Sequence, residues 1–230
     1  MKTIGLIGGM SWESSALYYR QINEAIKRQL GGLHSAKLVM VSVDFFEIEE
    51  LQRAGDWVRA GALLADAARS LQAAGADFLV LCTNTMHIVA PAITAAVPLP
   101  LLHIADPTAA AIRSAGLIKI GLLGTRFTME QAFYKDRLSA QHGLQVLLPS
   151  AEDRDTVHRI IFEELCLGQT LETSRQDYRR IMAALVDQGA QAIILGCTEI
   201  TLLVAAGDAS VPLFDTTALH ASAAAQHALL

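Results

Sequence analysis

The sequence predicts an α/β protein made of two pseudo-symmetric units, each a flavodoxin-like three-layer domain with a parallel sheet. Short apolar runs alternate with longer segments of helical composition, which is the rhythm of βαβ units. An internal repeat is the second observation, because residues 75–85 reappear in degraded form as residues 189–199, at a constant offset of 114. No linker rich in Pro, Ser or charge divides the halves. We therefore expect two closely packed copies of one unit.

The first half of the chain predicts strands at 3–7, 38–43 and 78–82, and helices at 12–30, 59–74 and up to about 96 in the segment that carries Pro91. Ser11 can serve as the N-cap of the first helix, and Gly75 can end the second. The segment after the second strand, with Asp44 and residues 47–52, is expected to be a loop that could close over a cleft.

The second half repeats this order, with strands at 118–123, 144–148 and 192–195 and helices near 129–140, 155–165 and 175–188. A further echo at offset 114 joins residues 97–100 to residues 211–214, each leading to an Asp and a final helix. We therefore expect a first domain at 1–97 plus 211–230 and a second at 98–210. Open α/β sheets bind ligands at the carboxyl ends of their strands, so the active site is expected in the cleft between the domains.

Composition narrows the class of function. The net charge of −5 is scattered along the chain, and phosphate binding needs clustered Lys and Arg, so no nucleic-acid partner is expected. No apolar stretch approaches the roughly 18–20 residues that a membrane helix needs, and the short apolar run after Lys2 is not followed by a cleavage pattern. We expect a cytoplasmic protein with a small-molecule partner.

The glycine-rich turn at residues 5–10 resembles a dinucleotide fingerprint but lacks the Gly-x-Gly-x-x-Gly spacing, so no nicotinamide or flavin cofactor is expected. Its glycines would let backbone N–H groups approach a small anion at a helix N-terminus. The alternative is that they only form a tight turn. The seven histidines show no ligand spacing and the three cysteines are far apart, so no metal site is expected.

The segment at residues 82–87 concentrates hydrogen-bonding groups where a strand ends. Thr83, Asn84 and Thr85 offer two hydroxyls and an amide, and such a donor cluster fits a carboxylate. Helix capping by Asn84 or Thr85 is the alternative. His87 could orient a neighbour, contact a substrate, or simply cap or pack.

The segment at residues 196–199 is the matching site of the second copy. A cysteine at a helix N-terminus beside hydroxyl donors should favour its thiolate, as a nucleophile or proton-transferring group needs. A lone cysteine is more often a small buried hydrophobe. Here the repeat aligns Cys197 with Thr83, a polar position, which favours a functional thiol.

These residues resemble the aspartate/glutamate racemase family of cofactor-independent amino-acid racemases. The resemblance covers nearly the whole chain and rests on Gly8-Gly9-Met10-Ser11 with Tyr18-Tyr19, on Val43-Asp44-Phe45, on Asn84-Thr85 with His87, on residues 121–125 and on Gly196-Cys197-Thr198-Glu199. It implies two α/β domains that hold the substrate between two cysteines. One removes the α-proton, and the other returns a proton on the opposite face. It also implies that the Asn-Thr donors hold the carboxylate and that no cofactor, pyridoxal phosphate included, is used.

The chain departs from the family pattern at the first cysteine. Thr83 precedes Asn84, and the cysteine is one position earlier, at Cys82. Successive side chains of a strand point to opposite faces, so Cys82 is expected to be buried behind Thr83 unless a local bulge restores it to the cleft. The catalytic pair is then Thr83 and Cys197. Because a hydroxyl is a far weaker base than a thiolate, Cys197 would be the main base and the rates would be biased in direction.

The resemblance implies an acidic substrate, aspartate or glutamate, while broader specificity stays open. Family members dedicated to aspartate use two basic side chains for the second carboxylate. One lies in the segment after Val43-Asp44-Phe45, which here offers Gln52 and Arg53. The other lies on the helix before the glycine of the second half, where residues 163–166 offer no Lys or Arg. The expected substrate contacts are Met10, Gln52, Thr83, Asn84, Thr85, Thr125, Thr198 and Glu199. Dimers are typical of the proteins that the chain resembles, so a homodimer is compatible with this interpretation.

Two other functions stay open. Arylmalonate decarboxylases, which resemble this architecture, keep only the second-half cysteine, and maleate isomerases use a cysteine as nucleophile. The loss of the first cysteine makes such Cys197-only chemistry an alternative. A protein that binds amino acids without catalysis is the other, although a pure binder has no need for the Cys197 thiol.

Overall fold

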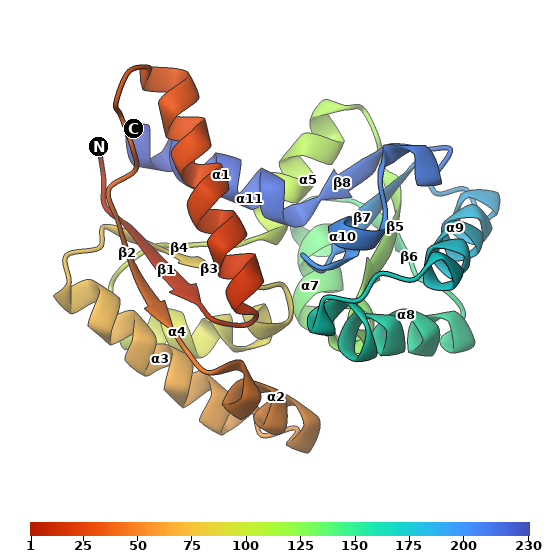
Figure 1. Cartoon of the computed structure of the whole chain (residues 1–230), viewed down its shortest axis with the longest axis horizontal. Helices are drawn as coiled ribbons and strands as arrows, with labels where there is room; N and C mark the ends of the chain where they lie inside the picture. Colours follow the sequence, from red (N-terminus) through yellow and green to blue (C-terminus); the bar gives the residue numbers. More distant parts are fainter. The chain divides into compact units, whose positions relative to one another are not determined.

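The computed structural model describes all residues, 1–230, and divides them into two units. The first comprises Met1–Ile104 with His220–Leu230, and the second comprises Ala105–Leu219. Each unit contains one four-stranded parallel sheet with flanking helices (Figure 1). This confirms the predicted fold class of two α/β units with parallel sheets. No helix is both long and apolar enough to cross a membrane.

The first unit has the strand order β2-β1-β3-β4. Its elements are β1 (Ile4–Gly8), α1 (Trp12–Leu30), β2 (Leu38–Ser42), α2 (Phe45–Ala54), α3 (Trp57–Ala73), β3 (Phe78–Leu81), the 3-10 helix η1 (Thr85–Val89), α4 (Ala90–Ala96), β4 (Leu101–Leu102) and most of α11 (Thr216–Leu229). Helix α1 begins after Ser11, whose hydroxyl accepts from the N–H of Ser14 at 3.3 Å, so the predicted N-cap is confirmed.

The second unit has the equivalent order β6-β5-β7-β8. Its elements are α5 (Ala105–Ser114), β5 (Lys119–Gly124), α6 (Arg126–Glu130), α7 (Ala132–Asp136), the π-helix η2 (Arg137–Gln141), β6 (Gln145–Leu147), α8 (Ala151–Glu163), η3 (Leu165–Leu167), α9 (Glu172–Asp187), β7 (Ala192–Gly196), α10 (Ile200–Leu203), η4 (Ala206–Asp208) and β8 (Leu213–Asp215). Helix α5 packs against β8, while α8 and α9 pack against β5.

Side chains of β3 and the residue after it alternate between two apolar clusters of the first unit. Phe78, Val80 and Cys82 pack with residues of α1 and α11 on one face of the sheet. Leu79 and Leu81 pack with residues of α2, α3 and α4 on the other. This alternation makes the unit three-layered, and the two groups of helices lie on opposite sides of the sheet in Figure 1.

The internal repeat extends to individual hydrogen bonds. Gly75 and Gly189 both adopt positive φ, at 86° and 95°. In each copy the following alanine donates its N–H to the carbonyl of a leucine five residues earlier, at 3.1 Å in the first unit and 3.0 Å in the second. The equivalent side chains Asp77 and Gln191 both accept from a backbone N–H at the start of the neighbouring strand, at 2.6 Å and 3.0 Å. The two units are therefore copies of one local design.

The expected domains, 1–97 plus 211–230 and 98–210, change too early along the chain at both boundaries. The structure changes from one unit to the other after Ile104 and again after Leu219. Strand β4 pairs with β3, so the chain leaves the first unit only after Ile104. Strand β8 pairs with β7, so the chain returns only at His220. Both strands are short and only half-buried, so their apolar runs did not show which sheet each one completes.

Two helices also differ from expectation. The predicted loop after β2 is the helix α2, capped by Asp44, whose carboxylate accepts from the N–H of Phe46 at 3.1 Å. Its buried residues Ile48, Leu51 and Gln52 have the i, i+3, i+4 spacing of a helix, a signal that the many surface glutamates concealed. The single helix expected at 129–140 is instead three short pieces, α6, α7 and η2.

The turn after β1 requires glycine at position 9. Gly9 has φ 96°, and a Cβ on it would lie 2.1 Å from the carbonyl oxygen of Val43. Gly75 has a similar φ of 86°, but a Cβ there would meet nothing within 4 Å. The Gly9→Ala variant should therefore lose roughly 3 kcal/mol or more of folding free energy through overpacking. Gly75→Ala, the matched control, should lose about 1–2 kcal/mol through φ alone. Chemical denaturation measures both, and equal losses would show that the Val43 contact relaxes freely.

Candidate functional site

Two strand-end turns, one in each unit, carry most of the residues that the sequence singled out. In the first unit the turn follows β3 and holds Thr83, which is half-buried. Cys82 has no exposed surface and packs with Tyr18 and Ile22 of α1, and this burial raises the pKa of its thiol far above the ordinary range. The structure therefore places Thr83 at the surface of the turn and Cys82 in the core.

Asn84 and Thr85 are both buried, with 3% and 6% of their surfaces exposed. The Asn84 side chain makes no capping hydrogen bond to η1. Gln52 reaches this turn from α2, because its amide donates to Sδ of Met86 at 3.0 Å. The first unit thus brings Gln52 next to the turn that carries Thr83, Asn84 and Thr85, and simple helix capping does not account for Asn84.

The glycine-rich turn between β1 and α1 is held mainly by its own side chains. The Gly9 N–H donates to Oγ of Ser15 at 2.7 Å, and the Ser15 hydroxyl donates to the carbonyl of Ser11 at 3.0 Å. Met10 is 5% exposed and packs in the apolar cluster on the α2 and α3 face of the sheet. The Gly9 N–H is therefore already satisfied within the turn, and the Met10 side chain belongs to the core.

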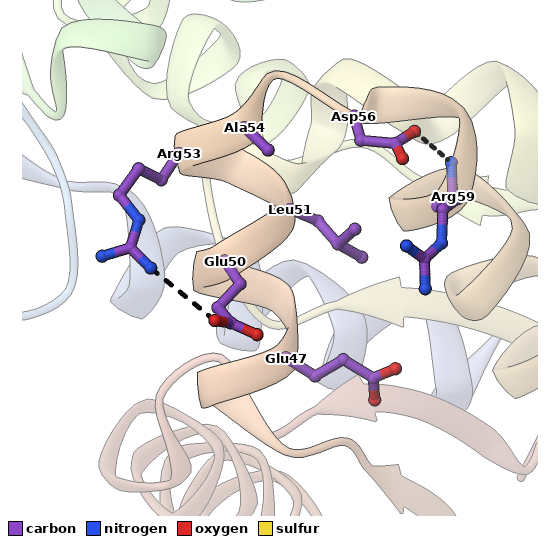
Figure 2. Close-up of a pocket in the computed structure, with 7 residues that line it drawn as sticks. All are labelled: Glu47, Glu50, Leu51, Arg53, Ala54, Asp56 and Arg59. Atoms are coloured by element: carbon purple, nitrogen blue, oxygen red, sulfur yellow. Dashed lines mark hydrogen bonds and ion pairs between the residues drawn. The ribbon is translucent and has the colours of Figure 1, made fainter.

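Arg53 lies apart from Gln52, although the two are neighbours in sequence. Its guanidinium is 3.9 Å from Glu49 and 3.8 Å from Glu50, on a side chain that is 68% exposed. Figure 2 shows Arg53 directed towards Glu50 along the outside of α2. It contributes to a cavity of about 490 Å³ lined by Glu47, Glu50, Leu51, Arg53, Ala54, Asp56 and Arg59. None of the predicted catalytic or substrate-contacting residues lines this cavity, and Arg53 is engaged on its own helix.

In the second unit the equivalent turn follows β7 and holds Cys197, which is half-buried. Its thiol donates to Oε2 of Glu199 at 2.9 Å. The pKa of Cys197 is raised well above its ordinary value, first by burial and then by the negative charges of Glu199 and Cys166. The expected thiolate is thus not favoured. The backbone N–H of Glu199, the N-cap residue of α10, lowers the pKa by hydrogen bonding to Cys197, but α10 has only four residues and this contribution is smaller than the effects that raise the pKa.

Hydroxyls at the start of α11 support the Cys197 turn. Thr216 donates to the carbonyl of Leu195 at 2.9 Å, and Thr217 donates to Oγ1 of Thr198 at 3.2 Å. Asp215 caps the same helix by accepting from the N–H groups of Thr217 and Ala218 at 2.9 and 3.1 Å, and burial raises its pKa. Sequence reasoning missed both threonines. The Asp-Thr-Thr run after an apolar segment was the available signal for an N-terminal cap.

Thr125 lies at the end of β5 and caps α6. Its hydroxyl accepts from the N–H of Thr128 at 3.3 Å and lies 3.3 Å from the Thr128 hydroxyl.

Glu164, at the end of α8, accepts from Arg159 at 2.9 Å and from Ser174 at 2.5 Å. An arginine, Arg159, therefore lies close to residues 163–166, the segment that contains no Lys or Arg of its own. Its guanidinium is already paired with the Glu164 carboxylate. No group of three or more His, Cys, Asp or Glu is arranged to hold a metal ion.

The contact between Glu199 and Cys197 predicts a pH effect. An anionic Glu199 raises the pKa of the thiol, so Glu199→Gln should lower it and increase the thiolate fraction at a given pH. Alkylation of Cys197 by iodoacetamide should then extend to lower pH, as measured by peptide mass spectrometry that separates Cys197 from Cys166. Glu163→Gln, which removes a carboxylate that does not act on Cys197, is the control. An unchanged pH profile for Glu199→Gln would contradict the assigned cause.

Comparison with known proteins aligns residues 7–224 with a family model described as Asp/Glu/Hydantoin racemase. Among curated proteins, the broad specificity amino-acid racemase RacX of Bacillus subtilis (strain 168) is 25% identical over 161 residues. The aligned part is 66% of this chain and 65% of that protein, so it spans slightly less than two thirds of the curated relative's length.

Two solved structures are similar over the entire chain. A Yersinia pestis protein, described provisionally as an Asp/Glu racemase, is 63% identical, with a TM-score of 0.94 and 100% of both chains covered. An aspartate racemase homologue from Pyrococcus horikoshii OT3 is 33% identical, with a TM-score of 0.85 and the same coverage. The likeness therefore includes both units and the two strand-end turns.

Proposed function

Because the chain belongs to the Asp/Glu/hydantoin racemase family, we propose that it racemises free α-amino acids without pyridoxal phosphate, with Cys197 and Thr83 acting on opposite faces of the α-carbon. The observation that carries this proposal is the equivalence of the two turns. Thr83 and Cys197 follow the third and seventh strands of two units with the same strand order, at the same repeat offset. Two equivalent groups suit a reaction that treats both faces of one carbon alike.

Cys197 is the proposed base for one enantiomer. Its thiol must lose a proton before the sulfur can accept the α-proton, and the Glu199 carboxylate lies in hydrogen-bond contact to receive it. Thr83 then gives its hydroxyl proton to the opposite face of the carbanion and regains one from solvent. Each turnover removes one proton and returns one, so no oxidant or reductant is needed.

Asn84 and Thr85 are the proposed holders of the substrate α-carboxylate, because their buried amide and hydroxyl follow Thr83 directly. Thr125, Thr198 and Glu199 are proposed contacts from the second unit. Gln52 is the side chain from α2 that reaches the first turn, whereas Arg53 is engaged with its own helix. A neutral amide accommodates a polar side chain as well as an acidic one. We propose aspartate or glutamate as substrate, within a specificity that extends to other polar amino acids.

The test is incubation of the wild-type protein with each pure L- and D-amino acid in deuterated water, followed by NMR of the α-proton. Racemisation replaces the α-proton by deuterium and forms the opposite enantiomer. Exchange and inversion with aspartate or glutamate would support the proposal. Their absence with every amino acid, in a folded protein, would refute it.

The burial of Cys82 also favours a second candidate. With that thiol in the core, Cys197 is the cysteine left at the two equivalent turns, as Cys197-only chemistry requires. A decarboxylase of this kind would release carbon dioxide from a malonate-type substrate, which the racemase would not. Binding of amino acids without α-proton exchange would instead indicate a non-catalytic binding protein.

A further inference from the structure

His87 is bonded through both ring nitrogens. It is 1% exposed and lies four residues after Thr83, in η1. Its Nδ1 is 2.8 Å from the carbonyl oxygen of Thr83, and its Nε2 is 3.2 Å from the backbone nitrogen of Ile104. The ring therefore connects the Thr83 peptide to the residue after which the chain leaves the first unit.

These partners fix the tautomer of His87. A carbonyl oxygen can only accept, so Nδ1 carries the hydrogen, and a backbone N–H can only donate, so Nε2 is the bare nitrogen. A neutral imidazole with its proton on Nδ1 satisfies both bonds. Neither ring nitrogen remains for a proton-transfer step with a substrate.

The hydrogen bond to His87 completes the fixation of Thr83. The Thr83 N–H donates to the carbonyl of Leu81 at 2.9 Å, and the Thr83 carbonyl accepts from the His87 side chain, so hydrogen bonds hold the main chain on both sides of the Thr83 Cα. The His87 ring is itself packed in the first unit. Its centroid is 4.4 Å from that of His103 and 6.0 Å from that of His220. The buried ring is therefore fixed by its neighbours, and through its hydrogen bond it restricts the movement of the Thr83 carbonyl.

We propose, on the basis of the proposed function, that His87 is a positioning residue that sets the place of the Thr83 hydroxyl by holding the Thr83 carbonyl. Two substitutions separate its hydrogen bonds. His87→Asn places an amide N–H near the Nδ1 position and keeps the donor to Thr83. His87→Gln places its amide near the Nε2 position, where it can accept from Ile104, and loses the donor to Thr83.

The discriminating measurement is the ratio of α-deuterium exchange with retained configuration to inversion, for the enantiomer that Cys197 deprotonates. Cys197 can return a solvent-derived proton to its own face without Thr83, whereas inversion requires Thr83. A displacement of about 1 Å can cost on the order of 10²-fold in rate. His87→Gln should therefore lower inversion by about that factor while exchange falls much less. His87→Asn should remain within roughly tenfold of wild type.

Tyr18→Phe is the matched control, because it removes another buried hydrogen bond from the same group of rings, the 2.8 Å contact of the Tyr18 hydroxyl with Nδ1 of His220. It should lower the melting temperature and leave the exchange-to-inversion ratio unchanged. If inversion and exchange fall equally in His87→Gln, or if the Asn and Gln variants behave alike, the positioning role is wrong.

Long-range ¹H–¹⁵N NMR of wild-type His87 gives a readout that does not depend on activity. An Nδ1–H tautomer supports the inferred bonds, and an Nε2–H tautomer overturns them. The absence of racemisation by the wild-type protein with every amino acid would instead refute the proposed function, and the catalytic consequence of His87 with it.

Discussion

Cys197→Ala should abolish racemisation in both directions, with kcat reduced by on the order of 10³–10⁴-fold. Both directions should be lost because, in the proposed mechanism, the same sulfur removes the α-proton of one enantiomer and returns a proton to form it from the other. The Cys197 thiol lies beside Glu199 in a half-buried turn, and alanine removes the sulfur that would exchange protons there. Steady-state rates from each pure enantiomer, followed by chiral chromatography, measure the loss.

Cys166→Ser is the control for Cys197→Ala. Cys166 lies on η3 of the same unit, half-buried and close enough for its charge to influence Cys197. Its exchange for serine removes one of the smaller causes that raise the Cys197 pKa, but no group that donates or accepts a proton in the proposed mechanism, so kcat should change far less than in Cys197→Ala. Retention of more than about a tenth of wild-type kcat by Cys197→Ala would place the base elsewhere.

Thr83→Cys should produce the second large effect, a gain of roughly 10²-fold in kcat for the slow direction. A thiol loses its proton far more readily than a hydroxyl, so a sulfur at this position can act as a base as well as a donor. The equilibrium constant between enantiomers is one, so kcat/KM must be equal in the two directions for any variant. The bias of the wild-type protein is therefore expected in kcat, with a matching difference in KM, and Thr83→Cys should bring the two kcat values closer together.

Thr83→Ser and Thr83→Val test whether the hydroxyl is the active group. Serine keeps the hydroxyl and should retain inversion, whereas the near-isosteric valine should lose it and still permit α-exchange through Cys197. Full inversion by Thr83→Val would exclude a role for the hydroxyl. Equal kcat values for both directions in the wild-type protein would remove the reason for expecting a gain from cysteine.

The sequence predicted the strand-end turns because they depend on local pattern. Apolar runs of strand length end in small polar residues, and the offset of 114 aligns Thr83 with Cys197 in the amino-acid sequence alone. The alternation of side chains along a strand was enough to expect Cys82 behind Thr83, and Cys82 lies in the core between the sheet and α1. The first inference used an internal repeat and the second used alternation over a few residues, and both patterns can be read from the sequence alone.

What the sequence did not predict depends on contacts between distant residues. The pairing of β4 with β3 and of β8 with β7 is set by two and three residues, too few for a pattern, and it moved both domain boundaries. The bond from His87 to Ile104 spans 17 residues and cannot be read from either segment.

The electrostatics of Cys197 were predicted in the wrong direction. The expectation assumed that a helix N-terminus would dominate at the sulfur, whereas burial and the Glu199 carboxylate raise the pKa by more than the Glu199 N–H at the start of a four-residue helix lowers it. A sequence pattern gives the order of these residues but neither how deeply the thiol is buried, which is the largest cause of the pKa shift, nor which group faces it.

The separation of Cys82 from Thr83 has an evolutionary consequence. Because the residue at position 82 fills the core and the residue at position 83 does not, the group at 83 can change without repacking the sheet. In the genetic code, threonine and cysteine are connected through serine by single-base steps, and serine keeps a hydroxyl. Stepwise changes of this one codon could therefore convert a pair of thiols into the proposed pair of a hydroxyl and a thiol, or the reverse. The packing of the sheet, and with it the stability of the fold, would stay the same at each step.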